Sequence, residues 1–189
     1  MRTSRSGAGS MKPYVRGKSI FLREVIEDDA EYILQLRTDP KKGRHLSATS
    51  SDLDSQKKFI ANYSESLTDF YFVICDWMWK RLGTVRIYDI KGDSFCWGSW
   101  IISDSAPTST AIESALLLYD FAFLSLHYQN SHFDVRKEND RVIRFHERFG
   151  AKITGEDECN LYFSYDLATY LKVRRKYAKF LPGDCNGTR

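Results

Sequence analysis

The hydrophobic pattern of the first forty residues predicts a strand followed by a helix. Residues 19–25 (S-I-F-L-R-E-V) alternate apolar and polar side chains, which is typical of a half-buried strand. Apolar positions then recur at helical spacing, after Asp28 or Asp29 as the capping residue, until Pro40 ends the helix. The chain therefore opens with a strand and a helix that share one core.

A polar stretch, residues 41–51, precedes a second predicted helix. Asp52 or Asp54 can cap this helix, which continues through Tyr63. The polar stretch itself is interpreted as a loop, either beside a substrate cleft or as a plain connection.

Three strands are expected next, over residues 70–75, 82–89 and 94–103. Residues 76–81 and 91–93 between them are typical of hairpin turns. The remaining elements expected are a helix over 110–126, a strand over 131–137, a helix over 140–149 stopped by Gly150, strands over 152–156 and 161–165, and a basic helix over 167–181.

This order predicts an α/β fold in which helices cover both faces of one mixed sheet of about seven strands. The chain has no internal repeat and no linker able to separate two domains. We therefore expect a single domain over residues 18–181, with flexible segments over 1–17 and 182–189.

Composition narrows the class of protein. The chain has 189 residues, 42% of them hydrophobic, and a formal net charge of only +3, so nothing calls for a nucleic-acid or membrane partner. The four cysteines are widely spaced and lack a nearby set of histidines, so neither a metal site nor a disulfide framework is predicted. A cytoplasmic monomer or homodimer is the expectation, and the basic final helix is interpreted as having a solvated face.

Three motifs in the second half carry a family resemblance. They are W-G-S-W-I-I at residues 97–102, D-F-A-F at 120–123 and V-R-K-E-N-D-R-V-I-R-F-H-E-R-F-G-A at 135–151. In this order they resemble the acetyl-CoA half of the GNAT N-acetyltransferases. The opening I-F-L-R-E-V-I-E-D-D-A at residues 20–30 is similar to the ribosomal-protein-acetylating branch and its small-molecule relatives.

The resemblance implies acetyl-CoA as co-substrate. Backbone groups of Trp100, Ile101 and Ile102 would pair with the pantetheine arm as an added strand would. One of their N–H groups could also face the thioester oxygen. The alternative is a well-packed central strand, and both can hold because the pairing uses only backbone.

The expected pyrophosphate loop departs from the family pattern. That pattern is Gln or Arg, two residues, Gly, any residue, then Gly or Ala, whereas residues 107–112 read P-T-S-T-A-I. The candidate donors are the hydroxyls of Thr108, Ser109 and Thr110 and the backbone that leads into Ala111 and Ile112. An ordinary helix cap is the competing interpretation.

Asn139, Phe145 and His146 are the other candidates that the resemblance implies around the donor. Asn139 can bond the pantetheine or its own turn, and Phe145 is assigned to the cofactor by position. His146 stands where many relatives carry a tyrosine that is thought to protonate the departing thiolate, although a lone helical histidine is more often a packing residue.

The base that would deprotonate an acceptor amine is not evident. Glu113 in the first turn of the long helix is one catalytic candidate, although a helix N-terminus favours a carboxylate in any case. Asp134 and Glu138 are weaker candidates, and a water chain is a further possibility because the thioester is already activated.

Acceptor contacts are expected from the first half of the chain and the central strands. The candidates are Arg37, His45, Tyr71, Arg86, Trp97 and Ser99. The motifs favour acetylation of a small primary amine, with a nucleotide-linked amino sugar as one option. Acetylation of a protein N-terminus or lysine, and a degenerate domain without activity, stay open.

Overall fold

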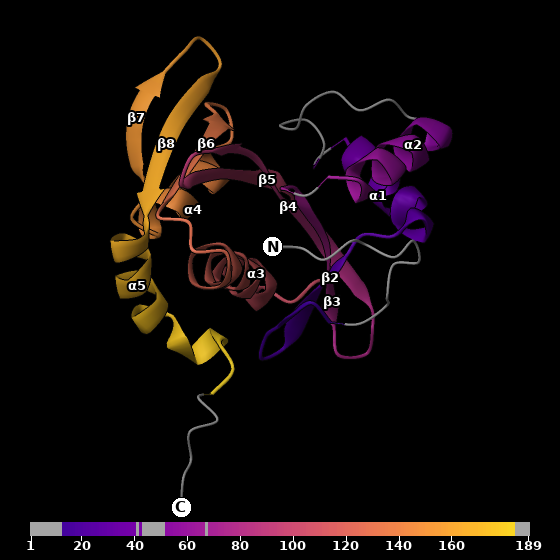
Figure 1. Ribbon diagram of the computed structural model, residues 1–189, viewed down its shortest axis with the longest axis horizontal. Coiled ribbons are helices and arrows are strands. Elements are labelled where there is room, and N and C mark those ends of the chain that lie inside the picture. The colour runs from indigo at the N-terminus through magenta and orange to yellow at the C-terminus, as the bar shows by residue number, and fades with distance from the viewer. Residues whose placement is uncertain (1–12, 41, 43–51, 67, 184–189) are drawn as a thin grey trace, which may run out of the picture.

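Eight strands form one sheet in the order β1-β2-β3-β4-β5-β6-β8-β7 (Figure 1). The computed structural model describes residues 13–40, 42, 52–66 and 68–183. The strands are β1 (Val15–Arg16), β2 (Ile20–Glu24), β3 (Phe70–Asp76), β4 (Arg81–Lys91), β5 (Ser94–Ile102), β6 (Asn130–Arg136), β7 (Lys152–Glu156) and β8 (Asn160–Asp166). The helices are α1 (Ala30–Thr38), α2 (Leu53–Ser64), α3 (Ser109–Tyr119), α4 (Asp140–Arg148) and α5 (Leu167–Lys176).

Helices cover both faces of this sheet, as β3 illustrates. Its residues are buried from Phe70 to Cys75, because successive side chains enter two different cores. Phe70, Phe72 and Ile74 join the core that α3 and α5 cover, whereas Tyr71, Val73 and Cys75 join the core under α1 and α2 (Figure 1). The expected α/β architecture with one mixed sheet is therefore confirmed.

The eighth strand comes from the N-terminal hairpin. Val15 and Arg16 pair with Leu22 and Phe21, so the expected domain boundary at residue 18 falls inside a paired hairpin. The expectations for residues 1–12, 43–51 and 184–189 lie outside the described residues.

In two predicted helices, the regular α-helical part ends before the last residue of the apolar pattern that predicted it. The first, α3, changes at Asp120 into a wider π-helical segment, Asp120–Ser125. The Tyr170 hydroxyl donates to the Leu116 carbonyl at 3.0 Å and also contacts the Asp120 carboxylate, so α5 holds this transition. The second, α5, is followed by a 3-10 turn, Ala178–Phe180. None of the helices within the described ranges is both long and apolar enough to cross a bilayer.

Two neighbouring strands pair only at one end. β5 runs parallel to β6, and the paired residues are Ser94 with Asn130 and Phe95 with Ser131. Ser94 Oγ also lies 2.7 Å from His132 Nδ1, which ties the two strands together at this closed end. Beyond it the strands separate, and this opening positions the candidate site.

Candidate active site

The edge of β5 that faces β6 is open from Cys96 to Ile102. Among the described residues, no ladder pair joins this stretch to β6. Its backbone N–H and C=O groups on that side are therefore available to an extended ligand, as at an exposed sheet edge. A ligand of this kind would lie between the two strands.

A β-bulge bends β5 at the same place. Ser99 and Trp100 together stand opposite the single residue Val85 of β4, and Ser99 has a positive φ of 47°. Thr84 Oγ1 donates to the Ser99 carbonyl at 2.9 Å, and Arg37 Nη1 of α1 donates to Ser99 Oγ at 3.3 Å. The bulge is thus held from both β4 and α1, and it turns the Ser99 side chain towards the acceptor half.

A cavity of about 300 Å³ lies at this opening. Its walls come from four directions: α1, β4, the β5 bulge, and β6 with the start of α4. The lining residues are Arg37, Tyr88, Trp97, Gly98, Ser99, Trp100, Phe133, Asp134, Val135, Arg136, Asn139, Val142 and His146.

His146 lies in the aromatic wall of the cavity. Its side chain is only 4% exposed, and its ring centroid is 4.2 Å from that of Phe133 and 5.3 Å from that of Trp97. Burial lowers the pKa of His146 to about 3, so the imidazole is neutral near pH 7. Its Nδ1 is buried and makes no hydrogen bond to the described residues, which leaves one polar atom of the wall unsatisfied.

The wall around His146 is rigid because its tryptophans are anchored. Trp97 Nε1 donates to Tyr119 Oη at 2.9 Å, and Trp100 Nε1 donates to Ser114 Oγ at 3.1 Å. Both partners belong to α3, so this helix fixes the rings that face the opening.

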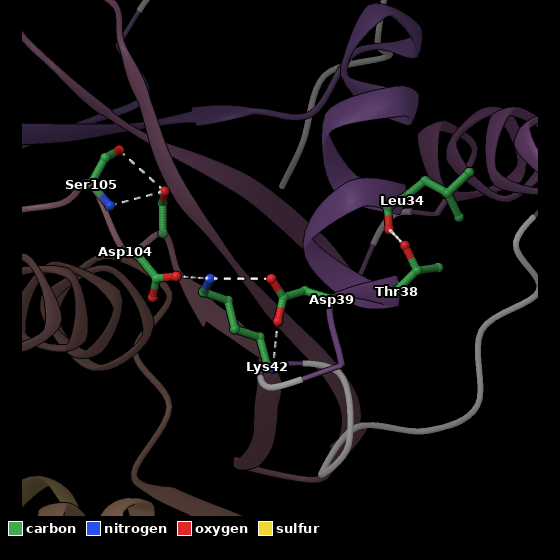
Figure 2. Close-up of polar contacts among 7 residues, drawn as sticks. Leu34, Thr38, Asp39, Lys42, Asp104 and Ser105 are labelled. Atoms are coloured by element: carbon green, nitrogen blue, oxygen red, sulfur yellow. Dashed lines mark hydrogen bonds and ion pairs between the residues drawn. The ribbon is translucent and has the colours of Figure 1, made fainter.

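The turn that leads into α3 lies beyond the end of β5. Among the described residues, the Thr108 side chain makes no capping hydrogen bond and Thr110 Oγ1 is buried without a partner, so no hydroxyl bond supports the competing interpretation as a helix cap. Figure 2 shows Lys42 between two carboxylates: its Nζ lies 2.6 Å from Asp104 in this turn and 3.5 Å from Asp39 after α1. The turn contains no Lys or Arg, and the Lys42 ammonium group, from the first half of the chain, therefore lies beside it.

A family model described as an acetyltransferase (GNAT) domain matches residues 19–152. The chain belongs to the GNAT family. No curated protein matches the sequence significantly. The open β5 edge, its bulge and the helix that follows are therefore parts of a GNAT domain.

Solved structures agree with this membership. The chain is 37% identical to FdhC, described as a nucleotide-linked sugar GNAT, with a TM-score of 0.82 over 89% of this chain and 98% of that one. A spermidine N-acetyltransferase from Vibrio cholerae in complex with CoA and spermine is 18% identical, with a TM-score of 0.71 over 81% of this chain and 98% of that one. Because the sequence identity to the spermidine N-acetyltransferase is only 18%, this similarity supports the shared fold and nothing about the substrate.

Asn139 lines the GNAT cavity at the start of α4. Its Oδ1 accepts from the Val142 N–H at 3.4 Å, so the amide caps the helix, while its NH₂ group has no hydrogen-bond partner among the described residues. Capping and ligand binding are compatible here, because they use different atoms.

Not every donor candidate borders the cavity. Trp100, Asn139 and His146 line it, and Phe145 packs on Trp100 with ring centroids 4.8 Å apart. The others lie along the end of β5 and the first turn of α3: Ile101, Ile102, Thr108, Ser109, Thr110, Ala111 and Ile112.

Glu113 does not lie at the cavity, which corrects its assignment as a catalytic candidate. Its side chain is 1% exposed, and Oε1 accepts from the backbone N–H groups of Ser19 at 2.7 Å and Ile20 at 3.2 Å. The carboxylate ties α3 to the turn before β2, where it satisfies two amides. This placement indicates a structural role.

The acceptor candidates divide into two groups. Arg37, Trp97 and Ser99 line the cavity. Tyr71 is buried in the core under α1 and α2, where burial raises its pKa, and it supports the site only from beneath. Arg86 is paired with Asp69 and lies 5.1 Å from the ring centroids of both Phe59 and Tyr88, so its guanidinium is already engaged. His45 lies outside the described residues.

Two cavity residues had only a weak signal in the sequence. Tyr88 shares a strand face with Arg86 by the two-residue period, so alternation alone could have placed it near the site. Asp134 lies between the buried Phe133 and Val135 on β6, and the same period turns it outward. What the sequence could not show is that both strands face one opening.

Proposed function

We propose that this GNAT domain transfers an acetyl group from acetyl-CoA to the primary amine of a nucleotide-linked amino sugar. The observation that carries the proposal is the open edge of β5 with the bulge at Ser99, beside a cavity that is walled on the acceptor side by α1 and β4. The 37% identity to FdhC over most of both chains supports the acceptor class.

The donor fits the β5 edge for a chemical reason. Pantetheine contains two amides, which can pair with unpaired strand groups between Cys96 and Ile102. The N-terminus of α3 presents backbone N–H groups and the positive end of its dipole to the pyrophosphate. In this proposal the missing glycines are tolerated because the backbone still offers its donors.

His146 contributes to the proposed reaction as a neutral hydrogen-bond partner. A pKa of about 3 leaves almost no imidazolium at neutral pH, so the ring is not the charged acid that its position suggests. Because His146 lines the cavity, a nitrogen of the neutral ring can instead bind a polar atom of the thioester or the acceptor.

A thiol-release assay tests this function. Purified protein is mixed with acetyl-CoA and, separately, with a panel of nucleotide-diphosphate sugars that bear a primary amine, with spermidine, and with a lysine-containing peptide. We expect CoA release with at least one amino sugar and an N-acetylated product of matching mass, in preference to spermidine and the peptide.

The competing functions give different results in the same assay. Preference for the peptide would indicate a protein acetyltransferase. Failure to bind acetyl-CoA by calorimetry would indicate a degenerate domain and would contradict the proposal.

A further inference from the structure

The cavity contains one carboxylate among its described lining residues, that of Asp134. This residue is exposed, and within the described part of the chain it makes no hydrogen bond or ion pair. Strand alternation fixes its direction, because Phe133 and Val135 on either side are buried in the core. A negative charge is therefore held at the opening with no partner among the residues that the structure describes.

Glu138 and Asp140 flank Asn139 but are not among the lining residues, and four other carboxylates of the described residues are engaged. Asp69 pairs with Arg86, Asp39 and Asp104 bind Lys42, and Asp89 binds Lys91 at 2.7 Å. The cross-strand neighbour of Asp134 is Tyr162, but the Tyr162 hydroxyl donates its hydrogen bond to Asp157 at 2.6 Å and not to Asp134.

The Asp134 charge acts across the opening and not only along its own strand. Burial raises the pKa of Tyr88 on β4, and the Asp134 carboxylate adds to this rise. Burial likewise raises the pKa of the Cys96 thiol on β5 to about 11, again with a contribution from Asp134. Asp134 also lines the same cavity as Tyr88 of β4 and Ser99 of β5, so the carboxylate shares the opening with both walls that an acceptor would touch.

We infer that Asp134 binds the amino group of the acceptor and serves as the general base of the transfer. The inference rests on the proposed function, because it needs an amine acceptor and a thioester donor in this cavity. A primary amine is largely an ammonium ion at neutral pH, so the Asp134 carboxylate, which lacks a partner within the described ranges, attracts it to this wall. His146, neutral and only 4% exposed, stands in the same cavity as an uncharged partner.

The proposed step balances in atoms and protons. The bound ammonium first gives one proton to bulk water, and the neutral amine that results attacks the thioester carbonyl carbon, so that a C–N bond forms while the carbonyl oxygen becomes negative. The nitrogen, now cationic, gives one proton to Asp134. The C–S bond then breaks, the carbonyl re-forms, and the sulfur receives one proton through water, so CoA leaves as a thiol and Asp134 is restored.

The test uses full-length protein, acetyl-CoA and the best amino-sugar acceptor from the panel. Asp134→Asn keeps the side-chain volume and removes the charge, Asp134→Glu keeps the charge, and Glu158→Gln removes an exposed carboxylate in the turn between β7 and β8 as a matched control. Acetyl-CoA affinity by calorimetry reports whether each variant keeps a folded donor site.

We expect Asp134→Asn to lower kcat by about 100-fold or more and to raise the acceptor KM, with acetyl-CoA affinity within two-fold of wild type. Asp134→Glu should recover part of kcat, and Glu158→Gln should behave as wild type. Near-normal kcat in Asp134→Asn, with or without a higher KM, overturns the inference while the proposed function stands. If wild type acetylates no panel amine, the proposed function fails and this inference fails with it.

Discussion

At the scale of single residues, the burial of His146 determines what chemistry it can perform. The ring is surrounded by Phe133, Trp97 and Phe163. These side chains carry no negative charge that could stabilise a protonated imidazole. Desolvation therefore lowers the pKa of His146 from 6.5 to about 3. A protonated ring would be favoured in the unfolded chain and disfavoured in the folded one.

This difference predicts a pH-dependent stability. Between pH 6.5 and about 3 the unfolded state binds the additional proton, so the free energy of unfolding falls as the pH falls through this window. The loss from pH 7 to pH 4.5 should be about 2–3 kcal/mol from this residue. His146→Phe keeps the aromatic contacts and should show a shallower decline in urea unfolding across that range. Parallel curves for the two proteins would contradict the assignment.

Glu113 supplies a second prediction at this scale. Its carboxylate accepts hydrogen bonds from two backbone N–H groups. Glu113→Gln preserves the shape of the side chain but removes its charge and weakens both hydrogen bonds. The variant should lose about 1–3 kcal/mol of unfolding free energy. Acetyl-CoA affinity and kcat should change less than two-fold at a temperature where the protein stays folded.

Glu147→Gln on the exposed side of α4 is the control, with no expected change in stability. A large loss of kcat with unchanged stability in Glu113→Gln would restore this residue as a catalytic candidate.

At the scale of elements, the residue of β5 that precedes the bulge is a glycine in close contact with Tyr88. A Cβ at Gly98 would lie 2.8 Å from Tyr88 Oη, and the hydroxyl is the end of a flexible side chain. Gly98→Ala should therefore displace Tyr88 into the cavity, and the acceptor kcat/KM should fall by about 10-fold, as expected of a shifted positioning group. The thiol-release assay measures this effect.

The matched background is Tyr88→Phe, which removes the atom that the new Cβ would meet. Gly98→Ala should cost much less in that background than in wild type, because the two changes share one contact. Equal losses in both backgrounds would indicate that the alanine disturbs the bulge itself.

The order of elements could be predicted from the sequence because each element carries a local signal. The apolar run of β3 and the Asp52 cap of α2, whose carboxylate accepts from the Ser55 N–H at 2.9 Å, are examples. The end of α3 could not be predicted, because it depends on Tyr170, a residue fifty-four positions beyond Leu116. The structural role of Glu113 could not be predicted for the same reason, because the backbone N–H groups that donate to it lie more than ninety residues earlier in the chain.

Some of the side chains that were expected at the candidate site line the cavity, and others do not. Trp97, Ser99 and His146 were expected at one opening and line one cavity. Tyr71 was expected at the cavity wall, but the continuous burial of β3 gives it a place in the second core. Asp134 was only a weaker candidate base, because the sequence could not show that it lines the cavity without a partner among the described residues.

At the scale of the whole molecule, the two halves of the chain meet at β5. Arg37 of α1 contacts the bulge, and Lys42 reaches the turn before α3 (Figure 2). The first half of the chain is therefore fastened both to β5 and to the turn that follows it. In the proposed function, the donor would bind in the opening between β5 and β6, and the acceptor would approach from the side of α1 and β4.

We propose that acetyl-CoA occupies this opening by pairing with the free edge of β5. Hydrogen–deuterium exchange with and without saturating acetyl-CoA measures it directly, because newly paired amides exchange more slowly. We predict slower exchange in peptides that cover Cys96–Ile102 and the first turn of α3, with no change in the exposed strand β7. Unchanged exchange along β5, or protection confined to another part of the sheet, would contradict the account.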